Sequence, residues 1–184
     1  SVPKRDEIDL KHTWNSQSVF ETTGAWETAA AEVGKSTEAI SAWQGRLSES
    51  PAVLLQALNA VYALVERVSQ VHVYASLGAA VDRTDQAAVE RAGRGQGLYS
   101  QAVAAISFVE PELLAIGRET LGAWLEAEPG LAIYGHYLDN LFRKQAHVRS
   151  AEIEELLGLV SEPFSGVFDN FLRINNRSAI NKRK

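Results

Sequence analysis

The sequence predicts an all-α protein, an antiparallel bundle of long helices with a non-helical amino-terminal arm. Two long stretches carry apolar residues at alternating gaps of three and four, the spacing that keeps side chains on one face of a helix. No stretch has the pattern of a strand pair. With 184 residues, 46% of them hydrophobic, the chain is long enough to bury a core as one domain.

The longest periodic stretch covers residues 51–81, and we expect the rest of the chain to pack around it. Ser50 offers a capping hydroxyl, and Pro51 lacks an N–H that the first turn would leave unpaired. One apolar face is formed by Leu54, Leu58, Val61, Val65, Val68, His72, Ala75 and Ala79. A second apolar register leaves only a narrow polar stripe, so this helix should be covered on several sides.

Residues 1–22 are polar and aperiodic, and we interpret them as an extended arm anchored by Trp14 and Phe20. A helical bundle is expected over residues 23–162. Its first helix should extend to Gly45 and return into the central helix through a short link. The apolar positions of this first helix are Trp26, Ala29, Ala30, Val33, Ile40 and Trp43.

A third, rod-like helix is predicted from residues 82–85 to Ile116, with a kink or a fresh helix start at Glu110-Pro111, because proline disfavours helical geometry in the residue before it. Gly93, Gly95 and Gly97 each cost about 1 kcal/mol relative to alanine, which close packing would have to offset.

Shorter helices should follow over residues 118–125, 131–143 and from Ser150 onward. The second of these is expected to bury Ile133, Tyr137, Leu138 and Leu141. The three phenylalanines of residues 163–184 predict a segment that docks on this chain or on another domain.

The net charge of −5 argues against a nucleic-acid partner, which would require clustered Lys and Arg. No run of 18 apolar residues exists, and the polar start is unlike a signal peptide, so we predict no membrane segment. The absence of cysteine excludes disulfides and thiolate ligands, and favours a cytoplasmic location.

The four histidines form no recognisable metal site. No HExxH occurs, and no glutamate precedes a histidine by three residues, so we predict no catalytic and no metal residue in this chain. His72 is interpreted as a hydrogen-bonded core residue. The segment 134–140, YGHYLDN, holds the densest group of functional-looking side chains, although its simpler interpretation is a helix with a buried aromatic side and with Asp139 and Asn140 in water.

Short motifs occur in a defined order along nearly the whole chain: Pro3-Lys4-Arg5, Thr13-Trp14-Asn15, Phe20, Trp26, Gly45-Arg46-Leu47, Tyr74-Ala75, Phe108, Pro111-Glu112-Leu113-Leu114, YGHYLDNL from residue 134, His147, Ser150 and Glu155-Leu156-Leu157. This order resembles the oligoendopeptidase F-type zinc metallopeptidases of the thimet oligopeptidase-like superfamily.

The resemblance implies the amino-terminal helical domain of such an enzyme. The family's zinc-binding HExxH lies in a larger downstream domain, so zinc is expected there and the family's catalytic residues map to no position here. In the family, both parts enclose a channel that admits short peptides. The sequence departs from the family where Asn175-Asn176 leads into Arg177, which leaves a natural short form, a truncated gene and a trimmed chain all open.

Two hypotheses follow. The first is a lobe that walls the substrate channel and meets the missing catalytic domain, through a face that includes Tyr134, His136 and Tyr137. Residues 163–184 would then lead toward that domain. The second is a stand-alone helical interaction or dimerisation module, whose partner is a second copy of the chain. An independent enzyme of unknown chemistry is a third, weaker alternative.

Overall fold

The computed structural model describes residues 7–145, and all regular structure within them is helical, which confirms the all-α class. The elements, in order, are η2 Leu10–His12, η3 Ser16–Ser18, α1 Thr23–Ile40, η4 Ser41–Trp43, α2 Pro51–Val81, α3 Gln86–Ala105, α4 Val109–Ile116, α5 Arg118–Ala127, η5 Pro129–Tyr134 and α6 Gly135–Gln145. Residues 15–142 form one compact unit, and the described residues 7–14 and 143–145 belong to a second. The predicted domain boundaries at residues 22 and 162 stay a prediction.

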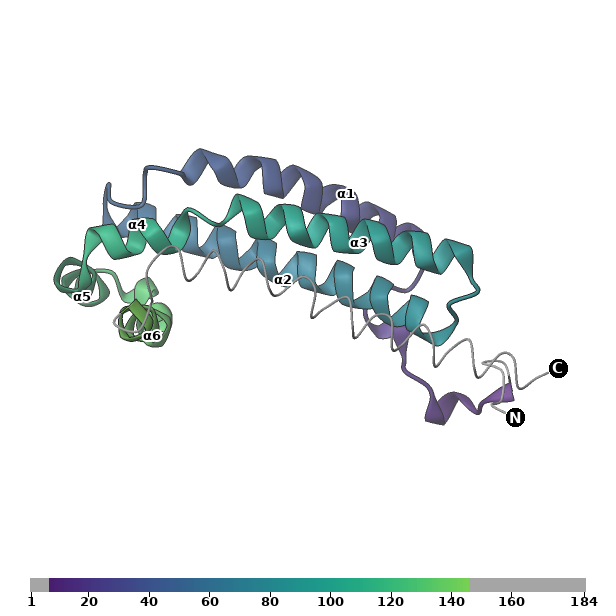
Figure 1. Ribbon diagram of the computed structural model, residues 1–184. Helices are drawn as coiled ribbons and strands as arrows, with labels where there is room; N and C mark the ends of the chain where they lie inside the picture. Colours follow the sequence, from purple (N-terminus) through teal and green to yellow (C-terminus); the bar gives the residue numbers. More distant parts are fainter. Residues whose placement is uncertain (1–6, 146–184) are drawn as a thin grey trace. The chain divides into compact units, whose positions relative to one another are not determined.

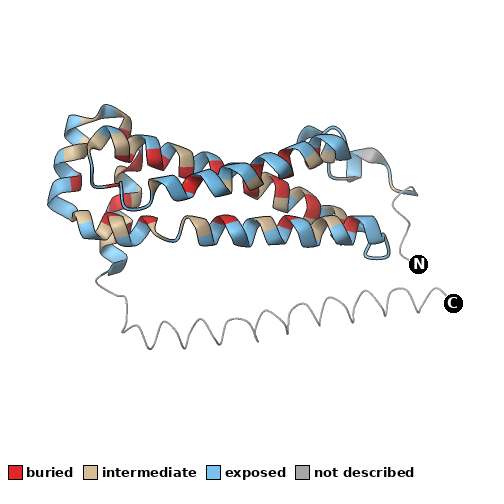
Figure 2. Ribbon diagram, turned by 90° about the horizontal axis from the view of Figure 1, so that it is seen from above, coloured by how far each residue is buried: buried red, intermediate tan, exposed pale blue. Residues whose placement is uncertain are grey.

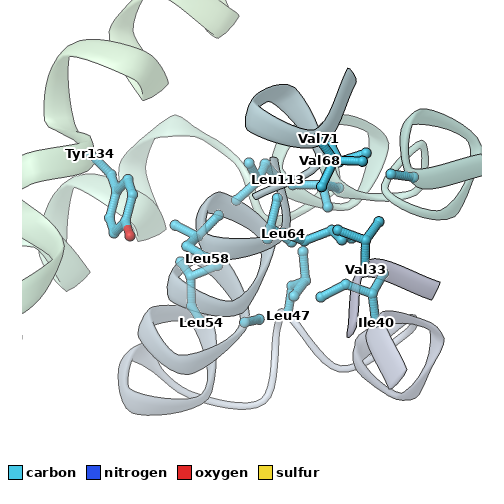
Figure 3. Close-up of a cluster of buried hydrophobic side chains, with 14 of the residues drawn as sticks. Val33, Ile40, Leu47, Leu54, Leu58, Leu64, Val68, Val71, Leu113 and Tyr134 are labelled. Atoms are coloured by element: carbon cyan, nitrogen blue, oxygen red, sulfur yellow. The ribbon is translucent and has the colours of Figure 1, made fainter. Parts of the chain in front are cut away.

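Three long helices, α1, α2 and α3, lie alongside one another and enclose the core (Figure 1). Buried positions follow their facing sides, while the outer sides are exposed (Figure 2). Figure 3 shows how Leu54, Leu58, Leu64 and Val68 of α2 meet side chains from α1 and α4. The central helix of the sequence analysis is therefore the element on which the others pack.

Local capping explains where these helices begin. Ser50 Oγ accepts a hydrogen bond from the Val53 N–H at 3.2 Å, and Pro51 occupies the first turn of α2. Thr22 Oγ1 accepts from the Ala25 N–H in the same way at the start of α1. The predicted bounds of the central helix, 51–81, are confirmed.

The close approach of α2 and α3 depends on one of the three glycines singled out above. A Cβ on Gly95 would lie 3.3 Å from the Ala75 Cβ and 3.4 Å from the His72 Cα, whereas a Cβ on Gly93 or Gly97 would meet nothing within 4 Å. Packing therefore offsets the cost of glycine at position 95 alone.

The predicted third rod is two helices, which agrees with the alternative of a fresh helix start. α3 ends at Ala105 and α4 begins at Val109, so the break precedes Pro111. Proline falls in the first turn of α4, where a missing N–H breaks no helical hydrogen bond. The chain interrupts the helix before the proline, and no kink at Glu110 is needed.

The predicted helix over residues 131–143 also divides in two. Residues 129–134 form the 3₁₀ helix η5, and α6 starts at Gly135. The tighter 3₁₀ geometry rotates the side chains, so Ile133 is 76% exposed while Leu131 and Tyr134 are buried. The prediction that Ile133 lies in the core is wrong.

His72 is half-buried rather than a core residue, which corrects the sequence interpretation. Its ring stacks on Tyr99 of α3 with centroids 5.2 Å apart, and its Nδ1 lies 3.4 Å from the Ser76 hydroxyl. Val65, expected on the apolar face of this helix, is 37% exposed. The covered face of α2 is thus narrower than its apolar pattern suggests.

The segment predicted as an extended arm is described from residue 7 and holds two short 3₁₀ helices, η2 and η3. Within the compact unit of residues 15–142, Phe20 is 5% exposed and packs edge-on against Tyr74 with ring centroids 5.2 Å apart. The arm itself stays a prediction. The predicted helix after Ser150 and the predicted docking of residues 163–184 lie outside the described residues.

Candidate functional site

The three residues proposed from the sequence as a partner or channel face lie at the η5–α6 junction. Tyr134 ends η5, while His136 and Tyr137 belong to the first turn of α6. Their side chains have different surroundings: Tyr134 is buried, Tyr137 is half-buried and His136 is exposed. The junction thus holds one structural side chain and two that reach solvent.

Tyr134 joins this junction to α2. Its hydroxyl donates a hydrogen bond to Asn59 Oδ1 at 2.6 Å, across 75 residues of sequence, and burial raises the pKa of the phenol. The ring points from its helix toward α2 in Figure 3. Because its polar end is satisfied inside the protein, Tyr134 positions the junction and offers little surface to a ligand.

Tyr62 of α2 completes the group and was missed by the sequence analysis. It is 44% exposed, and its ring centroid lies 5.1 Å from that of Tyr134 and 6.3 Å from that of Tyr137. Tyr62 follows Asn59 by one helical turn, so the sequence places both residues on the same side of α2. The sequence does not show which side of α2 the later helices cover, and Tyr62 was therefore not identified. We call Tyr62, Tyr134 and Tyr137 the tyrosine cluster.

Tyr137 has the strongest electrostatic perturbation in the cluster. Burial, followed by the Glu110 carboxylate, raises its pKa to about 12. A desolvated phenol near a carboxylate stays protonated at neutral pH, so Tyr137 acts there as a hydrogen-bond donor.

His136 points away from the core and interacts within its own helix. Its Nε2 lies 2.8 Å from the Asn140 Nδ2, one turn later. Which of the two side chains donates this hydrogen bond depends on the tautomer of the imidazole ring. The exposed surface of the junction therefore offers an imidazole, an amide and aromatic rings.

The described residues, 7–145, do not fit the zinc that the family resemblance implies. They contain no group of three or more His, Asp or Glu side chains placed to hold a metal ion. What the tyrosine cluster and His136 can do is bind, through aromatic surface and a few hydrogen-bonding groups.

By length and composition α2 is apolar enough to cross a membrane, a test that the core helix of a soluble protein also passes. In this fold α2 packs on α1, α3, α5 and η5.

Comparison with known proteins shows that the chain is similar to part of several oligopeptidases. The family model described as Oligopeptidase F matches residues 112–178. Group B oligopeptidase PepB of Streptococcus agalactiae is 30% identical over 176 residues, which is 96% of this chain and 29% of PepB. Oligopeptidase PepF of Bacillus subtilis is 27% identical, covering 95% of this chain and 26% of PepF.

The fold agrees with these sequence matches. The crystal structure of oligoendopeptidase-F from Enterococcus faecium superposes with a TM-score of 0.70 at 26% identity, covering 82% of this chain and 30% of that one. The chain thus spans less than a third of the length of the relatives it matches. Sequence and fold together show that it belongs to the oligoendopeptidase F family, as an amino-terminal region of that family.

Proposed function

We propose that this chain is the amino-terminal lobe of an oligopeptide-cleaving zinc metalloendopeptidase, which walls the substrate channel without catalytic residues of its own. The observation that carries the proposal is the match over 96% of this chain to 29% of a protein named as an oligopeptidase. Because the chain matches less than a third of that protein, we assign it a role in substrate access and substrate alignment. The catalytic chemistry is assigned to the remaining polypeptide. The same proposal places the protein in the cytoplasm, with neither membrane nor nucleic acid as partner.

The exposed part of the tyrosine cluster, with His136, is the proposed channel or partner-domain face. Aromatic rings such as Tyr62 and Tyr137 provide apolar contact area at a small cost in side-chain entropy. The Tyr137 ring and the His136–Asn140 pair are the groups that we propose to contact a short peptide or the catalytic domain. Zinc, when bound in such enzymes, polarises the scissile carbonyl and activates water; no residue described here takes part in that step.

The test of a non-catalytic lobe uses the purified chain. We expect no stoichiometric zinc by elemental analysis, and no cleavage of an internally quenched oligopeptide with added zinc. Zinc-dependent turnover that stays with the protein through successive columns would contradict the proposal.

The face itself can be tested by NMR titration of the labelled chain with a peptide of about ten residues. Shifts should concentrate at Tyr62, His136 and Tyr137, and His136→Ala should weaken binding. Gln101→Ala, an exposed change on α3, is the matched control. Equal binding by both variants, or shifts elsewhere, would remove this face from the proposal.

A further inference from the structure

Three arginines among the described residues make the same pair of contacts, one to an aromatic ring and one to a glutamate. The guanidinium carbon lies 5.5, 5.5 and 5.2 Å from the ring centroid for Arg46 over Trp43, Arg67 over Phe20 and Arg94 over Trp26. The same arginines form ion pairs at 2.9, 3.3 and 2.7 Å with Glu49, Glu32 and Glu27, respectively. A guanidinium suits both contacts at once, because its flat face stacks on a ring while its N–H groups bind a carboxylate.

The tyrosine cluster and Glu110 of α4 provide the ring and the carboxylate of a similar group. The rings of Tyr62 and Tyr137 have centroids 6.3 Å apart and planes at 87°, so they form two adjoining walls. Both side chains reach solvent, Tyr62 with an exposed fraction of 44%. Glu110 is exposed, and its carboxylate faces the Tyr137 hydroxyl. A carboxylate that accepts one hydrogen bond keeps further lone pairs for a second donor.

No arginine or lysine of residues 7–145 completes this group. Within these residues neither Tyr62 nor Tyr137 has a guanidinium over its ring, and Glu110 forms no ion pair. Glu66, one helical turn after Tyr62 on α2, is exposed and likewise forms no ion pair in the described part of the chain. The charge beside the cluster is therefore negative, which favours a cationic ligand.

The Tyr62 ring is supported from inside the protein. The ring of Tyr134 lies 5.1 Å from that of Tyr62, measured between centroids, and the Tyr134 hydroxyl is bonded to Asn59. A surface that is already ordered loses little conformational entropy when it binds. One cation contact at this surface should therefore make a measurable difference to affinity.

We propose that Tyr62, Tyr137 and Glu110 bind an arginine side chain of a short peptide, with the guanidinium against the rings and its N–H groups on the carboxylate. This inference rests on the proposed function, because it assigns a ligand group to the face already proposed to contact peptides. It adds a preference for basic peptides, which an aromatic surface alone does not predict. Arginine is favoured over lysine, because a planar guanidinium stacks on a ring and presents a fork of donors to a carboxylate.

NMR titration of the labelled full chain with two capped short peptides tests this preference. The two peptides share one sequence, except that one carries a central arginine and the other carries citrulline, which has a similar shape without the charge. The arginine peptide should bind at least about tenfold more tightly. Its binding should shift the ring signals of Tyr62 and Tyr137.

Two substitutions should remove the preference, and two matched substitutions should retain it. Glu110→Gln removes the paired charge, and Tyr62→Leu removes the ring while keeping an apolar side chain, so each should bring the two affinities together. Tyr62→Phe keeps a ring, and Glu126→Gln removes a carboxylate from the exposed surface of α5, so both should still prefer the arginine peptide. Circular dichroism checks that each variant keeps its helices.

The outcomes separate this inference from the proposed function. Equal affinity of the parent chain for the two peptides, with shifts at Tyr62 and Tyr137 in both titrations, would overturn the inference and support the proposed face. An arginine preference that survives in Glu110→Gln would also overturn it. Binding of neither peptide would overturn both the inference and the face. Arginine-selective binding by a chain that itself cleaves peptides would contradict only the proposed non-catalytic lobe.

Discussion

The indole N–H of Trp26 donates a hydrogen bond to the backbone carbonyl of Val71 at 2.9 Å, joining α1 to α2 across 45 residues of sequence. Trp26 is fully buried, and the Arg94 guanidinium of α3 lies 5.2 Å from its ring centroid. Arg94 in turn forms a bidentate ion pair with Glu27 at 2.9 and 2.7 Å. Trp26 therefore connects its own helix, α1, to both α2 and α3.

Replacing Trp26 with phenylalanine should lower the free energy of unfolding by about 1–3 kcal/mol, because the variant loses a buried hydrogen bond and leaves a cavity. Urea unfolding followed by circular dichroism measures this change. The control is Ile133→Ala, which removes an exposed apolar side chain and should stay within about 0.5 kcal/mol of the parent. A Trp26→Phe variant as stable as that control would show that the hydrogen bond contributes nothing.

Glu112 of α4 should hold the loop between α1 and α2. Its carboxylate accepts hydrogen bonds from the Gly45 N–H at 2.6 Å and the Leu47 N–H at 3.4 Å, beside the buried Leu47 side chain. Glu112→Ala should destabilise the fold by about 1–3 kcal/mol, and Glu112→Gln by less because one acceptor remains. Chemical denaturation of both, with exposed Glu126→Ala as control, gives the comparison. Equal stability of Glu112→Ala and Glu126→Ala would contradict the role of the loop contact.

The glycines of α3 should respond in opposite directions. Gly93→Ala and Gly97→Ala place a methyl group in open space and should raise the free energy of unfolding by up to about 1 kcal/mol each. Gly95→Val should lower it, because the added atoms meet Ala75 and the His72 backbone. Thermal melts of the three variants provide the test. A stabilising Gly95→Val would mean that α2 and α3 can separate without cost.

Tyr137 should make stability depend on pH in the alkaline range. Its folded pKa, about 12, lies above the ordinary value of 10, so between these values the folded state binds more protons than the unfolded state. The free energy of unfolding should therefore fall as pH rises from 10 to 12. Denaturation midpoints across this range measure the slope, and Tyr137→Phe should reduce it. An unchanged slope in Tyr137→Phe would assign the effect to other groups.

The start of α2 and the buried side of α1 could be predicted from the sequence. Ser50 and Pro51 start α2 as the sequence indicates, and the apolar positions of α1 from Trp26 to Ile40 are buried as their spacing predicts. Both signals act over one or two turns, so they are present in the sequence itself.

The candidate site could be predicted from the sequence only in part. Tyr134 and Tyr137 were identified, but Tyr62 was not, because its neighbours come from a segment more than 70 residues away. Ile133 and Tyr134 are adjacent apolar residues, and only the 3₁₀ turn of η5 decides which of them is buried.

The sequence by itself determined that this is a helical chain of oligoendopeptidase F type, with α2 at its centre. Only the tertiary structure decided which sides of α2 are covered, leaving His72 half-buried and Val73 exposed although the apolar pattern surrounds both. The physical reason is that periodicity and capping are local properties of a helix, whereas burial depends on where distant helices dock.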